Sequence, residues 1–115
     1  MEEPISTVDI TQFLALDMRV GTIVSAVVFE KARKPAYQLQ IDFGELGLKK
    51  SSAQITDLYT PETLVGKQVV AVVNFPPRQI ANFISEVLVL GSVNGEGRVT
   101  LLRPERLVTN GEKIA

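Results

Sequence analysis

Residues 37–43 read YQLQIDF and carry the strictest alternation of apolar and polar side chains in the chain. The odd-numbered positions are apolar and the even-numbered ones polar, which is the period of a strand that buries one face. Gly44 and Gly47 follow and predict a turn, after which residues 48–55 can return antiparallel. This segment therefore predicts two neighbouring strands of an antiparallel sheet.

Further strands are expected on both sides of this pair. Residues 18–29 are rich in valine and isoleucine and include Gly21, which suits a long curved strand with a bend. The sequence NGEG at 94–97 predicts a tight turn between the last two strands. The remaining expected strands are residues 68–75, 86–93 and 99–102.

Two short helices are expected outside these strands. At residues 9–16, Asp9 can cap the first turn and Gln12 stands three positions later, as in a capping box. The apolar stripe of this helix either seals the bottom of the fold or contributes to a subunit interface. At residues 60–66, Thr60 and a proline open the second helix and a glycine closes it.

The order strand, strand, strand, short helix, strand, strand, with a long bent first strand, is that of a five-stranded Greek-key barrel of the oligonucleotide/oligosaccharide-binding (OB) type. We therefore predict an all-β fold with one short helix between strands three and four and another at the N-terminus. A different small barrel or a sandwich is the alternative. A chain of 115 residues suits a single domain over residues 1–115.

Composition excludes several kinds of chemistry. The chain has no cysteine and no histidine, so zinc, iron–sulfur and catalytic-thiol sites lack their ligands, and a Ser–His pair is impossible. We therefore expect that the protein is not an enzyme and that it binds neither a metal nor a cofactor. Twelve Lys and Arg residues face 13 Asp and Glu residues, for a formal net charge of −1. A dedicated DNA-binding protein is usually strongly basic, so any role in nucleic-acid binding needs a local patch.

The location of the protein is predicted from segments that the sequence lacks. No run approaches the roughly 18 apolar residues that span a bilayer. Residues 1–10 include Glu2, Glu3 and Asp9, whereas a secretory signal has a basic start and an apolar stretch. We therefore expect a cytoplasmic protein without membrane insertion.

Two loops carry candidate binding residues. The loop at 30–36 has three cations in four residues and would lie at the rim of the barrel's binding face; a solvated hairpin tip is the alternative. The segment 74–86 is too apolar for an idle loop, because it includes Phe75, Ile80, Phe83 and Ile84. Those side chains must pack down, meet a second subunit or receive an apolar ligand.

Aromatic side chains are few, with five Phe, two Tyr and no Trp. Proteins that bind single-stranded nucleic acid on OB folds commonly stack bases on exposed aromatic rings. Alternation assigns Phe43 and Phe75 to the core, which leaves Tyr37, Tyr59 and Phe83 as stacking candidates. This small set weakens a general role in single-strand binding.

Residues 17–24, DMRVGTIV, resemble the opening of the tRNA-binding domain that occurs free and attached to some aminoacyl-tRNA synthetases. Within that superfamily the chain is most similar to the CsaA family of small, export-related bacterial chaperones, over about residues 17–113. Several segments in the right order carry the resemblance: ARKPA at 32–36, IDFG at 41–44, SSAQIT at 51–56, NFPPR at 74–78 and SEVLVLG at 85–91.

The resemblance implies an OB fold, a homodimer stabilised by the terminal extensions, and binding of unfolded or precursor polypeptides during protein export. The tRNA-binding relatives carry a His-Pro-x-Ala-Asp motif in the first loop, where this chain has RKPAY at 33–37. That departure moves the expected ligand towards polypeptide and leaves structure-specific tRNA binding as the alternative. Residues that still match the tRNA-binding pattern are Arg19, Asn74, Arg78 and Ser85.

The residues and the resemblance indicate one site, where the third strand meets the segment 74–86. Arg78 and Glu86 would select a ligand by charge or pair with each other. The predicted peptide- or RNA-binding residues are Arg19, Ser51, Ser52, Gln54, Asn74, Arg78, Phe83, Ser85 and Glu86. The predicted basic rim is Lys31, Arg33, Lys34, Lys49 and Lys50. Apolar residues at both ends support the homodimer: Ile5, Val8, Phe13, Leu107 and Val108.

Overall fold

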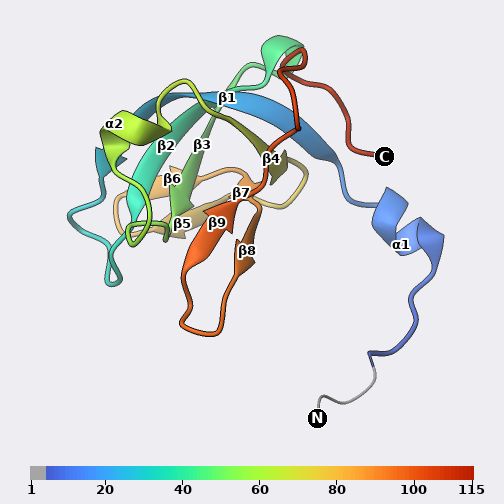
Figure 1. Ribbon diagram of the computed structural model, residues 1–115, viewed down its shortest axis with the longest axis horizontal. Helices are drawn as coiled ribbons and strands as arrows, with labels where there is room; N and C mark the ends of the chain where they lie inside the picture. The colour runs from blue at the N-terminus through green and yellow to red at the C-terminus, as the bar shows by residue number, and fades with distance from the viewer. Residues whose placement is uncertain (1–4) are drawn as a thin grey trace.

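The computed structural model describes residues 5–115, so Glu2 and Glu3 of the acidic start lie outside the described residues. A five-stranded antiparallel sheet in the order β3-β2-β1-β4-β7 curves into a nearly closed barrel (Figure 1). This confirms the predicted all-β fold of the OB type. The strands are β1 (Met18–Val28), β2 (Tyr37–Asp42), β3 (Leu48–Ala53), β4 (Gln68–Val72) and β7 (Leu88–Val89).

The long first strand belongs to both halves of the barrel. β1 pairs with β4 through its first five residues and with β2 through its later ones, and the register shifts between Ile23 and Ser25. Gly21 lies in this strand because the core leaves no room for a side chain there. A Cβ at this position would be 2.7 Å from Ile41 Cγ2 and 2.8 Å from the Phe43 ring.

The core confirms the alternation that predicted β2. Leu39, Ile41 and Phe43 are fully buried, together with residues of β1, β4 and the helix after β3. Every residue of β4 is buried, because this strand has a second apolar cluster on its other side. That second cluster, which residues from both ends of the chain cover, consists of Met18, Val20, Val70 and Val72 with Phe13, Leu16, Leu90, Val108 and Ile114.

Both predicted helices are present but short. In α1 (Ile10–Leu14), the Gln12 side chain accepts a hydrogen bond from the Asp9 amide at 2.7 Å. In α2 (Pro61–Leu64), Thr60 Oγ1 caps the Thr63 amide and Leu64 is fully buried. Ile10 and Leu14 of α1 are exposed, whereas Phe13 of the same helix packs against the second apolar cluster. The predicted turn after β2 includes the 3-10 helix η1 (Gly44–Leu46).

The segment after β4 departs from the prediction. β4 ends at Val72, and Phe75 is 44% exposed, so the assignment of Phe75 to the core is wrong. Residues 74–86 contain a hairpin of β5 (Arg78–Ile80) and β6 (Phe83–Ser85), where the prediction had a loop. The expected strand 86–93 is divided into β7 and β8 (Gly91–Val93), and β8 forms a second hairpin with β9 (Val99–Leu101).

Candidate functional site

A groove runs along the outside of the barrel between β3 and β5. Three adjoining hollows, of about 540, 260 and 430 Å³, all include Ser52, Arg78 and Ile80 in their walls. Ser52 comes from β3, and the other two residues come from the unpredicted β5. We call this feature the β3–β5 groove, with a first, a middle and a third hollow in the order of these volumes.

The first hollow is cationic. Its walls include Lys31, Arg33 and Lys34 from the loop between β1 and β2, and Arg78 faces them from β5. Of the residues that the structure describes, no aspartate or glutamate lines this hollow. The Phe29 amide donates to the Ala36 carbonyl at 3.0 Å across the base of the loop, and both residues are buried. Three of the five predicted rim cations therefore gather at one end of the groove.

The third hollow is predominantly apolar. The β8–β9 hairpin forms one wall, and the Asn94 side chain stabilises the hairpin turn by accepting hydrogen bonds from the Glu96 and Arg98 amides. Figure 1 shows this hairpin projecting from the barrel. Among the described residues of this hollow, only Arg78 has a charged side chain. The apolar lining of the hollow includes Ile55, Ile80, Leu88, Val93, Val99 and Leu101.

The middle hollow includes side chains that also close the barrel. Ser85 Oγ accepts a hydrogen bond from the Ser52 amide at 3.0 Å, and Glu86 Oε1 accepts one from the Lys50 amide at 3.0 Å. The Glu86 and Val87 amides in turn donate to the Lys50 carbonyl. The side chains of Ser85 and Glu86 thus supply hydrogen-bond acceptors for backbone amides at the outer edge of β3. A continuous fifth strand would otherwise supply them.

Arg78 and Glu86 do not pair with each other. Within residues 5–115, the only ion pair closer than 4 Å is the one between Arg19 and Asp17. Arg78 is exposed, and it lines all three hollows. The interpretation in which the two residues pair is therefore wrong, and selection of a ligand by the charges of Arg78 and Glu86 stays a prediction.

Four predicted residues of β3 and β6 lie outside these hollows. Ser51 is buried and donates to the Val87 carbonyl at 3.0 Å, because alternation along β3 turns it inwards while Ser52 faces out. The Lys50 ammonium lies 5.2 Å from the centre of the Phe83 ring, which packs at 5.4 Å against Phe29. Lys49 is half-buried and lines none of the three hollows.

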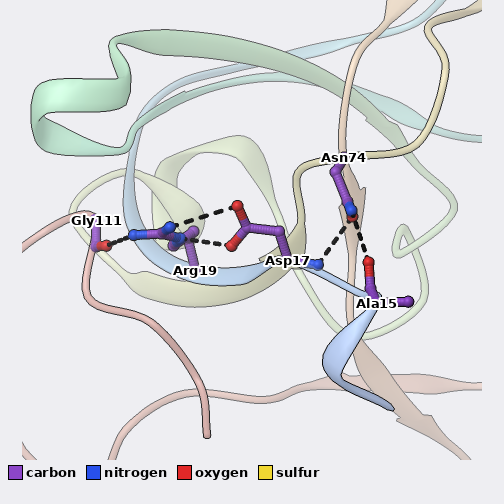
Figure 2. A network of polar contacts seen from close by, with 5 residues as sticks. All are labelled: Ala15, Asp17, Arg19, Asn74 and Gly111. Carbon is purple, nitrogen blue, oxygen red and sulfur yellow. Dashed lines mark hydrogen bonds and ion pairs between the residues drawn. The ribbon is translucent and has the colours of Figure 1, made fainter. Parts of the chain in front are cut away.

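Arg19 and Asn74 bind groups before β1 and near the C-terminus (Figure 2), and neither residue lines the three hollows. Arg19 donates to Asp17 Oδ1 at 2.6 Å and to the Gly111 carbonyl at 3.0 Å. The hydrogen bond with Asp17 raises the pKa of Arg19 above its ordinary value. Asn74 accepts from the Asp17 amide at 2.9 Å and donates to the Ala15 carbonyl at 2.8 Å. Both residues attach terminal segments to the barrel.

The proposed stacking residues do not form a platform. Tyr37 is 7% exposed and donates through its hydroxyl to the Tyr59 carbonyl at 2.7 Å, so the interpretation of Tyr37 as an exposed ring is wrong. The Tyr59 hydroxyl accepts from the Leu101 amide at 3.0 Å. Phe75, which the sequence assigned to the core, instead lines the middle hollow.

Sequence reasoning missed the apolar wall of the third hollow. Val93 pairs with Val99, and Gly91 with Leu101, across the β8–β9 hairpin. Directly opposite residues of an antiparallel pair lie on the same face. The predicted turn at 94–97 already implied these pairs, and they were the signal for a second apolar wall.

The described residues hold no group of three or more His, Cys, Asp or Glu side chains that could bind a metal ion. Within residues 5–115, no helix has the length and apolar character needed to cross a membrane. What the groove offers is hydrogen-bonding, cationic and apolar surface for a ligand.

Comparisons with known proteins show what the chain is similar to. Two solved structures of CsaA chaperones resemble it: that of Bacillus anthracis is 55% identical with a TM-score of 0.92 and covers 96% of this chain and 100% of its own. That of Picrophilus torridus is 52% identical with a TM-score of 0.89, covering 95% of this chain and 100% of its own.

Curated relatives place the same domain in larger proteins. Methionine–tRNA ligase of Parabacteroides distasonis is 36% identical over 107 residues, which is 93% of this chain but 16% of that protein. The chain thus spans about a sixth of the length of this relative. Residues 18–113 match the family described as "Putative tRNA binding domain". The chain belongs to this tRNA-binding domain family and, within it, to the CsaA chaperones.

Proposed function

We propose that this chain is a homodimeric molecular chaperone that binds unfolded or precursor polypeptides in the β3–β5 groove and serves protein export from the cytoplasm. The observation that carries the proposal is the groove itself, in which apolar and hydrogen-bonding walls lie side by side. The likeness to CsaA chaperones supports the same class of ligand. The role is binding and release, with no catalytic step and no cofactor.

An unfolded polypeptide offers the groove two kinds of group. Its apolar side chains fit the third hollow, where Ile80 and Leu88 are partly accessible. Its backbone amides and carbonyls can bond to the Ser52 hydroxyl and the Gln54 amide, which line the same groove. Such contacts are independent of a particular sequence, which suits a chaperone that holds and releases many clients.

The homodimer is supported by the terminal segments. Ile5, Val8 and Leu107 are 91%, 71% and 82% exposed, and large exposed apolar groups often mark interaction sites. Phe13 and Val108 pack against the barrel's second apolar cluster. The segments that bear the exposed residues are therefore anchored to the barrel and available to a second copy.

Structure-specific tRNA binding is the second candidate function, and the cationic first hollow favours it. Phosphate contacts release counterions, so tRNA affinity would fall steeply as salt concentration rises. An electrophoretic shift with tRNA at low salt, lost in an Arg33→Gln/Lys34→Gln variant, would support this function. Absence of any shift at low ionic strength would exclude it.

The primary proposal is tested by titrating a fluorescently labelled, unfolded precursor against the wild-type chain. Leu88→Ser removes an apolar group from the groove and should weaken binding about fivefold, since a half-buried leucine contributes about 1 kcal/mol. Leu58→Ser is the matched control, because Leu58 is equally exposed but lies outside the three hollows. If the wild type binds none of several unfolded clients, the proposal fails.

A further inference from the structure

The β3–β5 groove is polarised along its length. The first hollow has four cationic side chains near Ser52 and Gln54. The third hollow, in its described lining, has one charged side chain, that of Arg78. The two hollows meet at Arg78 and Ile80, so one extended ligand can occupy both. This asymmetry is unexpected in a chain whose formal net charge is −1.

We propose, on the basis of the function proposed above, that the groove selects polypeptide segments in which an apolar run lies next to carboxylates. The apolar run occupies the third hollow beside Leu88, and the aspartate or glutamate side chains occupy the first hollow beside Arg33 and Lys34. Carboxylates near several cations gain favourable interactions, while a cationic segment there is repelled.

The preference has a consequence for where clients are bound. A secretory signal has a positively charged start directly before its apolar stretch. With that apolar stretch in the third hollow, the positive start would meet Arg33, Lys34 and Arg78. The groove therefore disfavours signal sequences and favours apolar segments with acidic flanks, such as those in the body of a precursor.

The lining of the groove favours polypeptide over RNA as its occupant. Affinity of single-stranded nucleic acid for such surfaces depends on aromatic rings that stack with successive bases. Among the described residues, only one aromatic side chain lines the groove, that of Phe75 in the middle hollow. The apolar third hollow matches aliphatic side chains and, in its described lining, offers phosphates a single cation, Arg78.

The test uses labelled peptides that share one six-residue apolar core and differ in a flank of three glutamates, three glutamines or three lysines. Each peptide is made in two versions, one with the flank before the core and one with the flank after it. Fluorescence anisotropy at about 50 mM salt should give the order Glu, then Gln, then Lys. Because exposed ion pairs contribute roughly 1.5- to 5-fold each, we expect about tenfold between the Glu and Gln flanks. About 1 M salt should remove most of that difference, because screening is then nearly complete.

Two variants assign the preference to the first hollow. Arg33→Gln/Lys34→Gln should reduce the advantage of the Glu flank over the Gln flank about fivefold. Arg103→Gln/Arg106→Gln is the control of equal net charge, since both residues are exposed and lie outside the three hollows. It should leave both affinities as in the wild type.

The outcomes separate this inference from the proposed function. If the Lys-flanked peptide binds as tightly as the Glu-flanked one, the inference is wrong while polypeptide binding stands. If no flank gives binding, the proposed function fails. If a 12-nucleotide RNA displaces the Glu-flanked peptide at about 0.15 M salt and binds more tightly, the first hollow is a phosphate site and the inference is overturned.

Discussion

At Gly21 the barrel has no space for a side chain, because a Cβ there would lie 2.7 Å from Ile41 Cγ2. Gly21→Ala should therefore lower the free energy of unfolding by about 1–3 kcal/mol, the cost of overpacking a core. Urea denaturation measures the change. Gly95→Ala is the control, since nothing lies within 4 Å of its Cβ, and it should change stability by less than about 0.5 kcal/mol. Equal effects would contradict the packing explanation.

Asn74 attaches the segment before β1 to the barrel through two hydrogen bonds, to the Asp17 amide and the Ala15 carbonyl. Asn74→Ala should lower the free energy of unfolding by about 1 kcal/mol, because hydrogen bonds at an exposed site contribute modestly. Hydrogen exchange of the Asp17 amide should become faster. Asn82→Ala, at the exposed turn of the β5–β6 hairpin, is the control and should leave that amide unchanged.

At the residue level, the sequence predicts well on which face of a strand a side chain lies. It predicts less well which groups that side chain contacts. The alternation of β2 located three fully buried core residues correctly. On β3 the prediction placed both Ser51 and Ser52 in the site without applying this rule, and the structure buries Ser51 while Ser52 lines the groove. The partners of Asn74 are 57 and 59 residues away in the chain, and no local pattern encodes contacts at that separation.

At the element level, side chains complete the edge of β3. The Ser52 amide donates to Ser85 Oγ and the Lys50 amide to Glu86 Oε1. Glu86→Ala removes the acceptor and should speed hydrogen exchange of the Lys50 amide about fivefold, as expected for a loss of about 1 kcal/mol. Glu86→Gln retains an amide oxygen and should preserve most of the protection. Exchange in Glu86→Ala that equals the wild type would show that the Glu86 side chain does not protect this edge.

Ser85→Ala tests the neighbouring contact. The Ser52 amide should exchange faster by a similar factor, because its acceptor is lost while the backbone of β6 remains. Ser92→Ala, on the exposed face of β8, is the matched control. If exchange at Ser52 is unaffected by Ser85→Ala, another group or water supplies the acceptor, and Ser85 is released for ligand binding.

The elements that sequence missed are those with little local signal. β5 and β6 have three residues each, too few for a period of two to be recognised, and two prolines before them indicated a loop. The longer strands β1 and β2 were predicted correctly, and the short helix α2 was predicted from its capping threonine and proline. Because β5 contributes Arg78 and Ile80 to the groove, the missing hairpin is also why the site could be located only approximately.

At the scale of the whole molecule, the C-terminal segment runs beside the start of β1. The Ile114 amide donates to the Met18 carbonyl, and Arg19 bridges Asp17 and the Gly111 carbonyl. Phe75 and Arg78 of the groove lie just beyond Asn74, which holds the N-terminal segment. The N-terminal segment and the groove are thus attached near the last residues of β4, whereas the C-terminal segment also reaches its first residue, where Gln68 Nε2 donates to the Val108 carbonyl at 2.7 Å.

The proposed homodimer makes the last prediction. Ile10 and Leu107 are exposed at 66% and 82% on segments that the barrel positions but does not cover. Ile10→Asp/Leu107→Asp should convert a dimer to a monomer, because an uncompensated charge in an apolar interface is strongly unfavourable. Light scattering at micromolar concentration measures the mass, and circular dichroism verifies the fold. Leu58→Asp, with Leu58 also exposed but remote in sequence from both ends, should remain dimeric. A monomeric wild type would refute the dimer, and a dimeric double variant would place its interface elsewhere.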